Sequence, residues 1–138
     1  MPRIDFYILA ATQPAQRTHF ACRLAARAWR EGLSVWIRTP DHATSEQLDE
    51  ALWTFDEGSF IPHGLTPREG DNPIVIGDAP CPGALLINLA DSLADDWAER
   101  DRVAEIITAD EATRQAGRNR YRDYQQAGAT PQTHRIDH

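Results

Sequence analysis

The residues of this chain that are best suited to chemistry are arginines and tyrosines near its carboxyl end. Arg114, Arg118 and Arg122 are spaced four residues apart, so on a helix their side chains stack along one face. Tyr121 and Tyr124 fall on an adjacent stripe of the same helix. A guanidinium group is planar and binds a carboxylate or a phosphate through two parallel hydrogen bonds. The pattern therefore indicates a groove with an aromatic floor and a basic rim, which suits an extended acidic peptide with an apolar end.

The same residues also have a purely structural interpretation, in which the tyrosines anchor the core and the arginines solubilise the surface. The distribution of charge along the chain indicates which kind of ligand these residues would bind. The chain carries 14 basic and 21 acidic residues, for a net charge of −7, whereas residues 114–135 hold five arginines and a single acid, Asp123. A basic patch on an acidic protein favours a small anionic target, because long duplex DNA is attracted to a broadly positive face.

A second candidate surface lies in the middle of the chain. Trp53 falls one residue off the predicted apolar stripe of a helix, and a Phe-x-Pro sequence at residues 60–62 follows shortly after it. Large apolar residues around a loop and a proline-terminated strand can simply belong to the core. An off-stripe tryptophan in this setting is equally typical of a hot spot for a protein partner. The residues alone leave both interpretations open.

Motifs for catalysis or cofactor binding are absent from the sequence. The loop at residues 10–16 contains no glycine and the chain contains no lysine, so neither a dinucleotide fingerprint nor a Walker A motif is present. The five histidines and two cysteines show no metal-ligand spacing and no disulfide framework. We therefore expect no catalytic residues, no cofactor and no metal. Two weaker hypotheses are an enzyme with His63 as its base, and single-stranded DNA stacked on Tyr121 and Tyr124.

The elements that must position these residues alternate between strand-like and helix-like patterns. Short apolar runs predict buried strands, and apolar residues four apart predict helices that bury one face. A strand, a helix and a strand in this order form a βαβ unit, with parallel strands and a right-handed crossover. The predicted strands are Phe6–Leu9, Leu33–Ile37, Ser59–His63, Pro73–Gly77, Ala84–Leu89 and Val103–Ile107, with residues 64–72 as a loop. The predicted helices are Ala15–Glu31, Ala43–Trp53, Ser92–Asp101 and one that is capped by Thr108 or Asp110 and runs to about Gly128.

Together these elements predict one α/β domain over residues 1–128, with a Rossmann-like, open and mostly parallel sheet, helices on both faces and no phosphate-binding loop. Residues 129–138 are polar and contain Pro131, so we expect them to be extended or disordered. No apolar run approaches the roughly 20 residues that span a bilayer. The first residues lack the layout of a signal peptide, so we expect a cytoplasmic protein.

Three segments carry a family resemblance. Leu48–Trp53 reads Leu-Asp-Glu-Ala-Leu-Trp, Ser59–Leu65 reads Ser-Phe-Ile-Pro-His-Gly-Leu, and Arg118–Gly128 reads Arg-x-Arg-Tyr-Arg-x-Tyr-x-x-Ala-Gly. The opening strand and the Ala-rich helix that ends at Gly32 also fit, in the same order over nearly the whole chain. In these motifs the sequence resembles the chi subunit of the bacterial DNA polymerase III holoenzyme.

The resemblance implies a non-catalytic subunit that acts in DNA replication, with a fold like a helicase nucleotide-binding domain that has lost its phosphate loop. It implies two partners, the psi subunit, which connects chi to the clamp loader, and the acidic carboxyl-terminal tail of the single-stranded DNA-binding protein SSB. DNA is then reached only through SSB. The tail site maps onto Ile107, Arg118, Tyr121 and Arg122, and the psi site onto Trp53, Phe60, Pro62 and His63. Gln125 stands where some relatives carry a further base.

Overall fold

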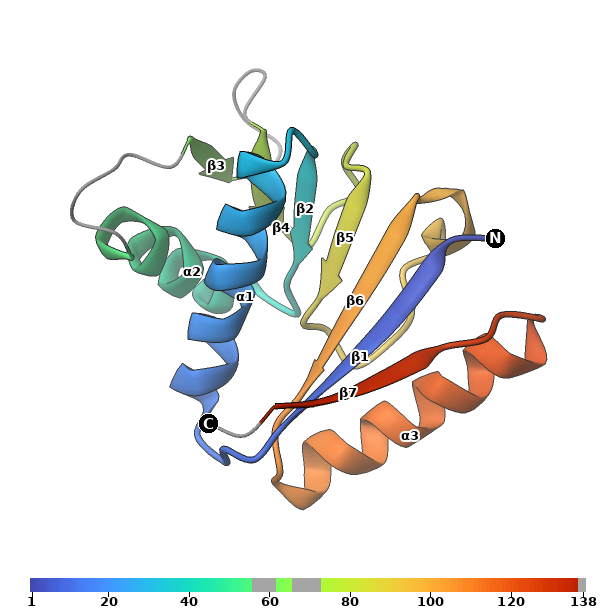
Figure 1. Ribbon diagram of the computed structural model, residues 1–138. Coiled ribbons are helices and arrows are strands. Elements are labelled where there is room, and N and C mark those ends of the chain that lie inside the picture. The colour runs from blue at the N-terminus through green and yellow to red at the C-terminus, as the bar shows by residue number, and fades with distance from the viewer. Residues whose placement is uncertain (56–61, 66–72, 137–138) are drawn as a thin grey trace.

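The computed structural model describes residues 1–55, 62–65 and 73–136, and it has an α/β fold (Figure 1). Within these residues seven strands form one sheet in the order β3-β4-β2-β5-β6-β1-β7, and every pairing is parallel. The predicted open, parallel sheet is therefore confirmed. The strands are β1 (Arg3–Leu9), β2 (Val35–Arg38), β3 (His63–Leu65), β4 (Ile74–Gly77), β5 (Leu85–Asn88), β6 (Arg102–Ile107) and β7 (Gln132–Ile136). The helices are α1 (Pro14–Arg30), α2 (His42–Thr54), the short 3₁₀ helix η1 (Trp97–Glu99) and α3 (Glu111–Gln126).

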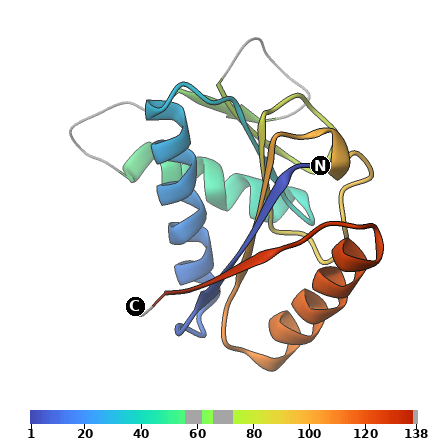
Figure 2. The same cartoon turned by 45° about the vertical axis from the view of Figure 1, so that its right-hand side comes forward.

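Helices cover both faces of the sheet, as predicted. α1 and α2 lie on one face and α3 on the other (Figures 1 and 2). Successive side chains of a strand point to opposite faces, so the central strands divide between two apolar clusters. In β2, Val35 and Ile37 pack with α1 and α2, while Trp36 packs with the cluster beneath α3. The runs of apolar residues in these strands therefore reflect burial on both sides.

The two ends of α3 are fixed by local chemistry. The Asp110 carboxylate accepts a hydrogen bond from the Thr113 backbone N–H at 3.1 Å, so Asp110 rather than Thr108 is the N-cap. Hydrogen bonds from the hydroxyls of Thr108 and Thr113 lower the pKa of Asp110 to about 2. Gly128 follows the helix with a φ of 95°, a left-handed conformation that favours glycine and ends the helix. Because both ends of α3 are fixed in this way, the face of the helix on which each residue lies is fixed as well.

Strand β7 was not predicted from the sequence. Gln132–Ile136 pair in parallel with β1 as the last strand of the sheet. His134 connects the two strands, because its Nε2 lies 2.7 Å from an Asp5 carboxylate oxygen and its ring stacks on Tyr7 at 5.1 Å. The carboxyl-terminal segment thus extends the sheet beyond β1.

Two other predictions about elements need correction. The predicted helix Ser92–Asp101 is wrong, since this segment holds only the single 3₁₀ turn at Trp97–Glu99. The Ser92 carbonyl accepts hydrogen bonds from Arg38 and Asn88 side chains, so it does not serve a helix. The predicted loop at residues 64–72 is also partly wrong, because Gly64 and Leu65 pair with β4 in strand β3. Residues 59–61 of the predicted strand lie outside the described residues.

Candidate functional site

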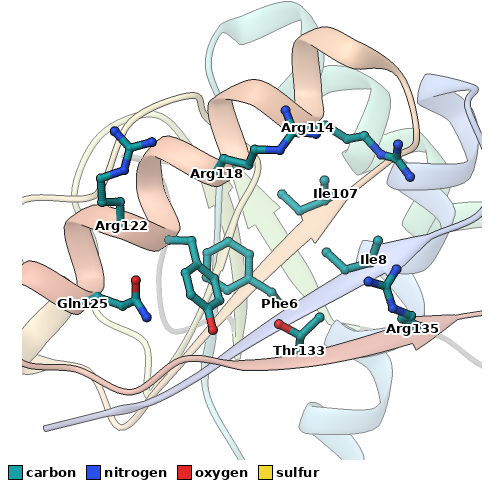
Figure 3. A pocket seen from close by; sticks show the side chains of 11 residues that line it. Phe6, Ile8, Ile107, Arg114, Arg118, Arg122, Gln125, Thr133 and Arg135 are labelled. Carbon is teal, nitrogen blue, oxygen red and sulfur yellow. The ribbon is translucent and has the colours of Figure 1, made fainter.

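A groove with a volume of about 500 Å³ lies between α3 and the β1–β7 side of the sheet (Figure 3). Its apolar floor consists of Phe6 and Ile8 from β1, Ile107 from the end of β6 and Gly117 from α3. Four arginines, which we call the arginine rim, surround this floor: Arg114, Arg118 and Arg122 from α3 and Arg135 from β7. Tyr121, Gln125 and Thr133 complete the lining. The groove combines apolar surface with positive charge.

The geometry of α3 explains the arginine rim. Four residues of α-helix rise about 6 Å and bring a side chain back to nearly the same face. Arg114, Arg118 and Arg122 are all exposed and follow one another along α3 at this spacing. Arg118 contacts Glu111 at 3.5 Å and Gln115 at 3.3 Å, both exposed contacts that contribute little. Within the described part of the chain, Arg114, Arg122 and Arg135 form no ion pair, so the arginine rim can accept an external carboxylate.

Tyr121 is half-buried at the edge of the groove. Its ring meets the edge of Phe6 with centroids 5.0 Å apart, and its hydroxyl donates a hydrogen bond to the Pro131 carbonyl at 3.3 Å. These two contacts fix the orientation of the ring. Tyr121 therefore offers a ligand a preset aromatic surface, while its hydroxyl is already occupied within the chain.

Gly117 allows the floor to form where α3 crosses the end of β6. A Cβ atom at position 117 would lie 2.7 Å from the Cδ1 of Ile107, too close for normal contact. Because Gly117 has no side chain, Ile107 keeps its place between the helix and the sheet. Ile107 is only 3% exposed, so it supports the floor from below and offers a ligand little surface.

The four residues assigned to the tail site by resemblance line this single groove: Ile107, Arg118, Tyr121 and Arg122. Gln125 lines it as well. The sequence analysis missed the contribution of β1 and β7, which supply Phe6, Ile8, Thr133 and Arg135. Alternation along the first strand could have placed Phe6 and Ile8 on one face. Thr133 and Arg135 could not have been found, because their strand was not predicted.

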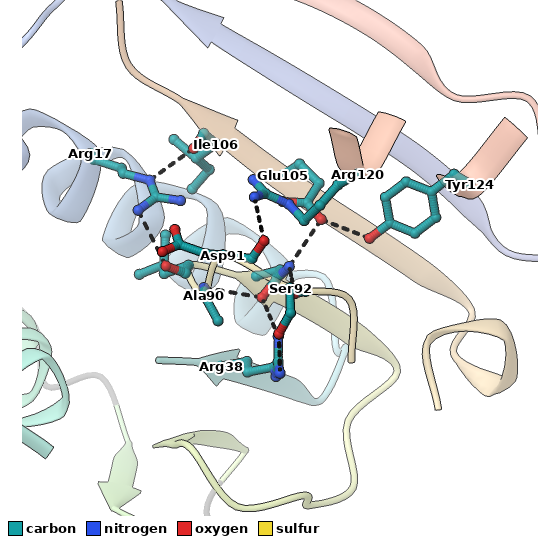
Figure 4. A network of polar contacts seen from close by, with 11 residues as sticks. Arg17, Arg38, Ala90, Asp91, Ser92, Glu105, Ile106, Arg120 and Tyr124 are labelled. Atoms are coloured by element: carbon teal, nitrogen blue, oxygen red, sulfur yellow. Dashed lines mark hydrogen bonds and ion pairs between the residues drawn. The ribbon is translucent and has the colours of Figure 1, made fainter. Parts of the chain in front are cut away.

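Tyr124 and Arg120 do not line the groove. Tyr124 anchors the core, as in the structural interpretation, whereas Arg120 is buried and does not solubilise the surface. They are buried on the sheet side of α3, where Glu105 accepts hydrogen bonds from Arg120 Nε at 3.0 Å and from the Tyr124 hydroxyl at 2.7 Å (Figure 4). The Asn88 side-chain amide donates a third hydrogen bond to Glu105 at 3.0 Å. Burial, together with the charge of Glu105, raises the pKa of Tyr124, so its hydroxyl remains a donor. The hypothesis that DNA bases stack on Tyr121 and Tyr124 together is therefore wrong, because Tyr124 is buried.

The polar network continues across the carboxyl ends of the central strands. Arg17 of α1 donates to the carbonyls of Ile106 at 2.8 Å and Leu89 at 3.2 Å, and burial lowers the pKa of its guanidinium (Figure 4). Arg38 at the end of β2 donates to Asn88 and to Ser92. The network joins both helical layers to the sheet. It holds α3, and with it the arginine rim, in a fixed orientation.

The second candidate surface lies where α2 meets β3. Trp53 is 57% exposed, and its ring meets the edge of His63 with centroids 5.0 Å apart. His63 is 8% exposed and its Nε2 lies 3.1 Å from an Asp49 carboxylate oxygen, so this histidine is part of the packing beneath Trp53 rather than an open base. Pro62 is half-buried, and Phe60 lies outside the described residues. Trp53 and His63 are thus brought together as neighbours.

The described residues contain neither a metal-binding cluster nor a membrane-spanning helix. No group of three or more His, Cys, Asp or Glu side chains in this part of the chain could hold a metal ion. None of the helices in the same residues is both long and apolar enough to span a bilayer.

Comparisons with known proteins agree along the length of the chain. The family model described as DNA polymerase III chi subunit, HolC, matches residues 1–132. The chain is 38% identical over 139 residues to the DNA polymerase III subunit chi of Pseudomonas aeruginosa, an alignment that covers 99% of this chain and 98% of the relative. It is 34% identical over 114 residues to the protein of the same name from Escherichia coli, covering 78% and 77% of the two chains. The corresponding protein of Haemophilus influenzae is 30% identical over 131 residues, with 90% of each chain covered.

Proposed function

Because the chain belongs to the DNA polymerase III chi subunit family, we propose that it is a non-catalytic accessory subunit that connects two partners during DNA replication. One partner is the acidic carboxyl-terminal tail of SSB, and the other is psi, which leads to the clamp loader. In this proposal the protein acts in the cytoplasm without a cofactor and reaches DNA only through SSB.

The observation that carries the SSB proposal is the arginine rim around an apolar floor. The SSB tail ends in an apolar residue, with its own α-carboxylate beside it and acids before it. The apolar side chain would pack against Ile8 and Tyr121, above the buried Phe6 and Ile107. Arg118 and Arg122 would then bind the terminal carboxylate and the preceding acids through charge-assisted hydrogen bonds.

The exposure of the groove sets the expected strength of this interaction. Exposed charge pairs are screened by water and salt, so each contributes less than a buried pair would. We expect a micromolar affinity, about −8 kcal/mol, which decreases as salt is added. An SSB tetramer offers several tails, which raises the apparent affinity for clustered copies of this protein without any new contact.

Calorimetry with the full chain and a synthetic peptide of the SSB tail tests the site. Arg118→Ala and Arg122→Ala should each weaken binding by roughly 1.5–3 kcal/mol, because each removes a charged hydrogen-bond partner of the peptide. Arg27→Ala is the matched control, since Arg27 on α1 is also exposed but pairs with Glu31, just after the helix. Unchanged affinity in both α3 variants would show that the tail binds elsewhere.

The proposal for psi rests on the exposed ring of Trp53. A large aromatic side chain that is 57% exposed beside a packed histidine has the character of an interface hot spot. Trp53→Ala should abolish co-purification with psi and leave the affinity for the SSB tail unchanged. Loss of both interactions together would mean that the substitution had unfolded the domain, and retention of psi would remove Trp53 from the interface.

A further inference from the structure

Among the described residues, strand β7 has one edge without a partner strand, which we call its free edge. It is the last strand in the sheet, and β1 is its partner on the other side. The Ile136 carbonyl accepts a hydrogen bond from the Ala10 N–H at 3.2 Å, so the backbone of Ile136 faces β1. In an extended strand the backbone polar groups of successive residues point to alternate sides. The N–H and C=O groups of Thr133 and Arg135 therefore point to the free edge, where they can pair with another extended chain.

The side chains of the same two residues line the groove. Thr133 is paired in register with Phe6, and Arg135 with Ile8, so these four side chains share the face of the sheet that carries α3. Figure 3 shows Thr133 and Arg135 across the groove from Arg118 and Arg122. The free backbone groups and the arginine rim are thus adjacent parts of one surface.

The spacing of the arginine rim matches an extended chain that runs along α3. Arg114, Arg118 and Arg122 follow one another at about 6 Å along the helix axis. Alternate residues of a β-strand, whose side chains lie on one face, are separated by roughly 6.6 Å. An extended peptide can therefore present one carboxylate to each arginine from every second residue.

We propose that the acidic tail binds as an added strand on the free edge of β7, with its backbone paired to Thr133 and Arg135 and every second side chain turned toward the arginine rim. This proposal rests on the proposed function, and it adds the conformation of the bound peptide. The occupant is an extended acidic peptide, because the charge of the four arginines selects carboxylates. Pairing through the backbone accounts for how an exposed site holds a flexible tail in one register.

A proline substitution separates strand pairing from charge. The Thr133 N–H faces away from β1, so Thr133→Pro removes a donor to the peptide while it leaves the β1–β7 pairing intact, as edge strands tolerate. Thr133→Ala is the matched control, because it removes the side chain and keeps the donor. We expect calorimetry with the tail peptide to show roughly five- to tenfold weaker binding for Thr133→Pro than for Thr133→Ala, because both lack the threonine side chain and only the proline lacks the N–H donor.

A second arm uses the unaltered protein and peptides methylated on single backbone nitrogens. N-methylation at every second position should weaken binding by a similar factor, and methylation at the positions between should have little effect. If Thr133→Pro lowers the thermal stability of the protein, the methylated peptides provide the test of strand pairing. If the tail binds and Arg118→Ala weakens it, yet neither Thr133→Pro nor any methylated peptide changes affinity, the added strand is overturned and the proposed function stands. If the unaltered protein does not bind the tail peptide, both fail.

Discussion

At the scale of single residues, arginine has two opposite roles within a short stretch of α3. Arg118 and Arg122 are exposed on the groove, whereas Arg120, between them in sequence, is 2% exposed and bound to Glu105. A step of two residues rotates about 200° around a helix, which explains the difference. Helical spacing is local, so the residues alone predicted Arg118 and Arg122 on one face with Tyr121 beside them, while only the family resemblance placed Ile107 in the same site. The sequence could not show that Arg120 is buried, because its partner Glu105 lies on a different element.

This division predicts very different effects for two neighbouring substitutions. Arg120→Ala should lower the free energy of unfolding by roughly 3–5 kcal/mol, because it leaves the buried carboxylate of Glu105 without its cation. Arg122→Ala should change it by no more than about 0.5 kcal/mol, as is usual for an exposed side chain. Urea unfolding measures the free energy of unfolding of both variants. Similar losses in the two would contradict the assignment of Arg120 to the interior.

At the scale of elements, the sequence predicted what is buried and missed what is held by distant contacts. The strands Val35–Arg38, Ile74–Gly77 and Leu85–Asn88 follow short apolar runs, which any search for buried strands detects. The residues of β7 are polar because the strand lies at an edge, and the contact between His134 and Asp5 joins residues at opposite ends of the chain. No local sequence pattern predicts such a strand. The segment around Trp97 was predicted as a helix, but the Ser92 carbonyl at its start accepts hydrogen bonds from the side chains of Arg38 and Asn88.

The cap of α3 makes the stability of this element sensitive to acid. The pKa of Asp110 is about 2 in the folded protein, below the ordinary 3.8, because the hydroxyls of Thr108 and Thr113 stabilise its charged form. A lowered pKa means that the stabilisation is complete above pH 3.8 and is lost as the pH falls through about 2. Since Asp110 is near the surface, solvent reduces the size of this effect.

Two substitutions separate the cap from its charge. Asp110→Ala should lower the free energy of unfolding by about 1 kcal/mol at neutral pH, the usual cost of losing an N-cap. Asp110→Asn retains a capping oxygen and should lose less stability between pH 3.8 and about 2 than the unaltered protein does. Urea unfolding across this pH range measures both. Identical acid profiles for the unaltered protein and Asp110→Asn would show that the charge of Asp110 has no part in stability.

At the scale of the whole molecule, the two candidate surfaces lie at opposite edges of the sheet. Trp53 and His63 belong to α2 and β3 at one edge, and the groove belongs to α3, β1 and β7 at the other (Figure 1). α2 and α3 also cover opposite faces. Such a separation suits a protein that holds two partners at once. The net charge of −7 suits a protein that binds an acidic tail locally and does not compete with SSB for DNA.

The separation predicts independent binding. The affinity for the SSB tail peptide should be the same within about twofold in the presence and absence of psi, because no described residue lines both surfaces and the coupling free energy between them should be near zero. Calorimetry of the tail peptide with the protein alone and with its psi complex measures this coupling. A change of tenfold or more would mean that the two surfaces communicate through the sheet.

We propose that the arginine rim binds the carboxyl-terminal tip of SSB, and a capture experiment with intact and truncated SSB decides whether it does. The full-length protein is immobilised and exposed to SSB that has or lacks its last residues. We expect that intact SSB is retained, that truncated SSB is not, and that Arg118→Ala combined with Arg122→Ala abolishes retention of the intact form. Equal retention of intact and truncated SSB, or full retention by the double variant, would contradict it.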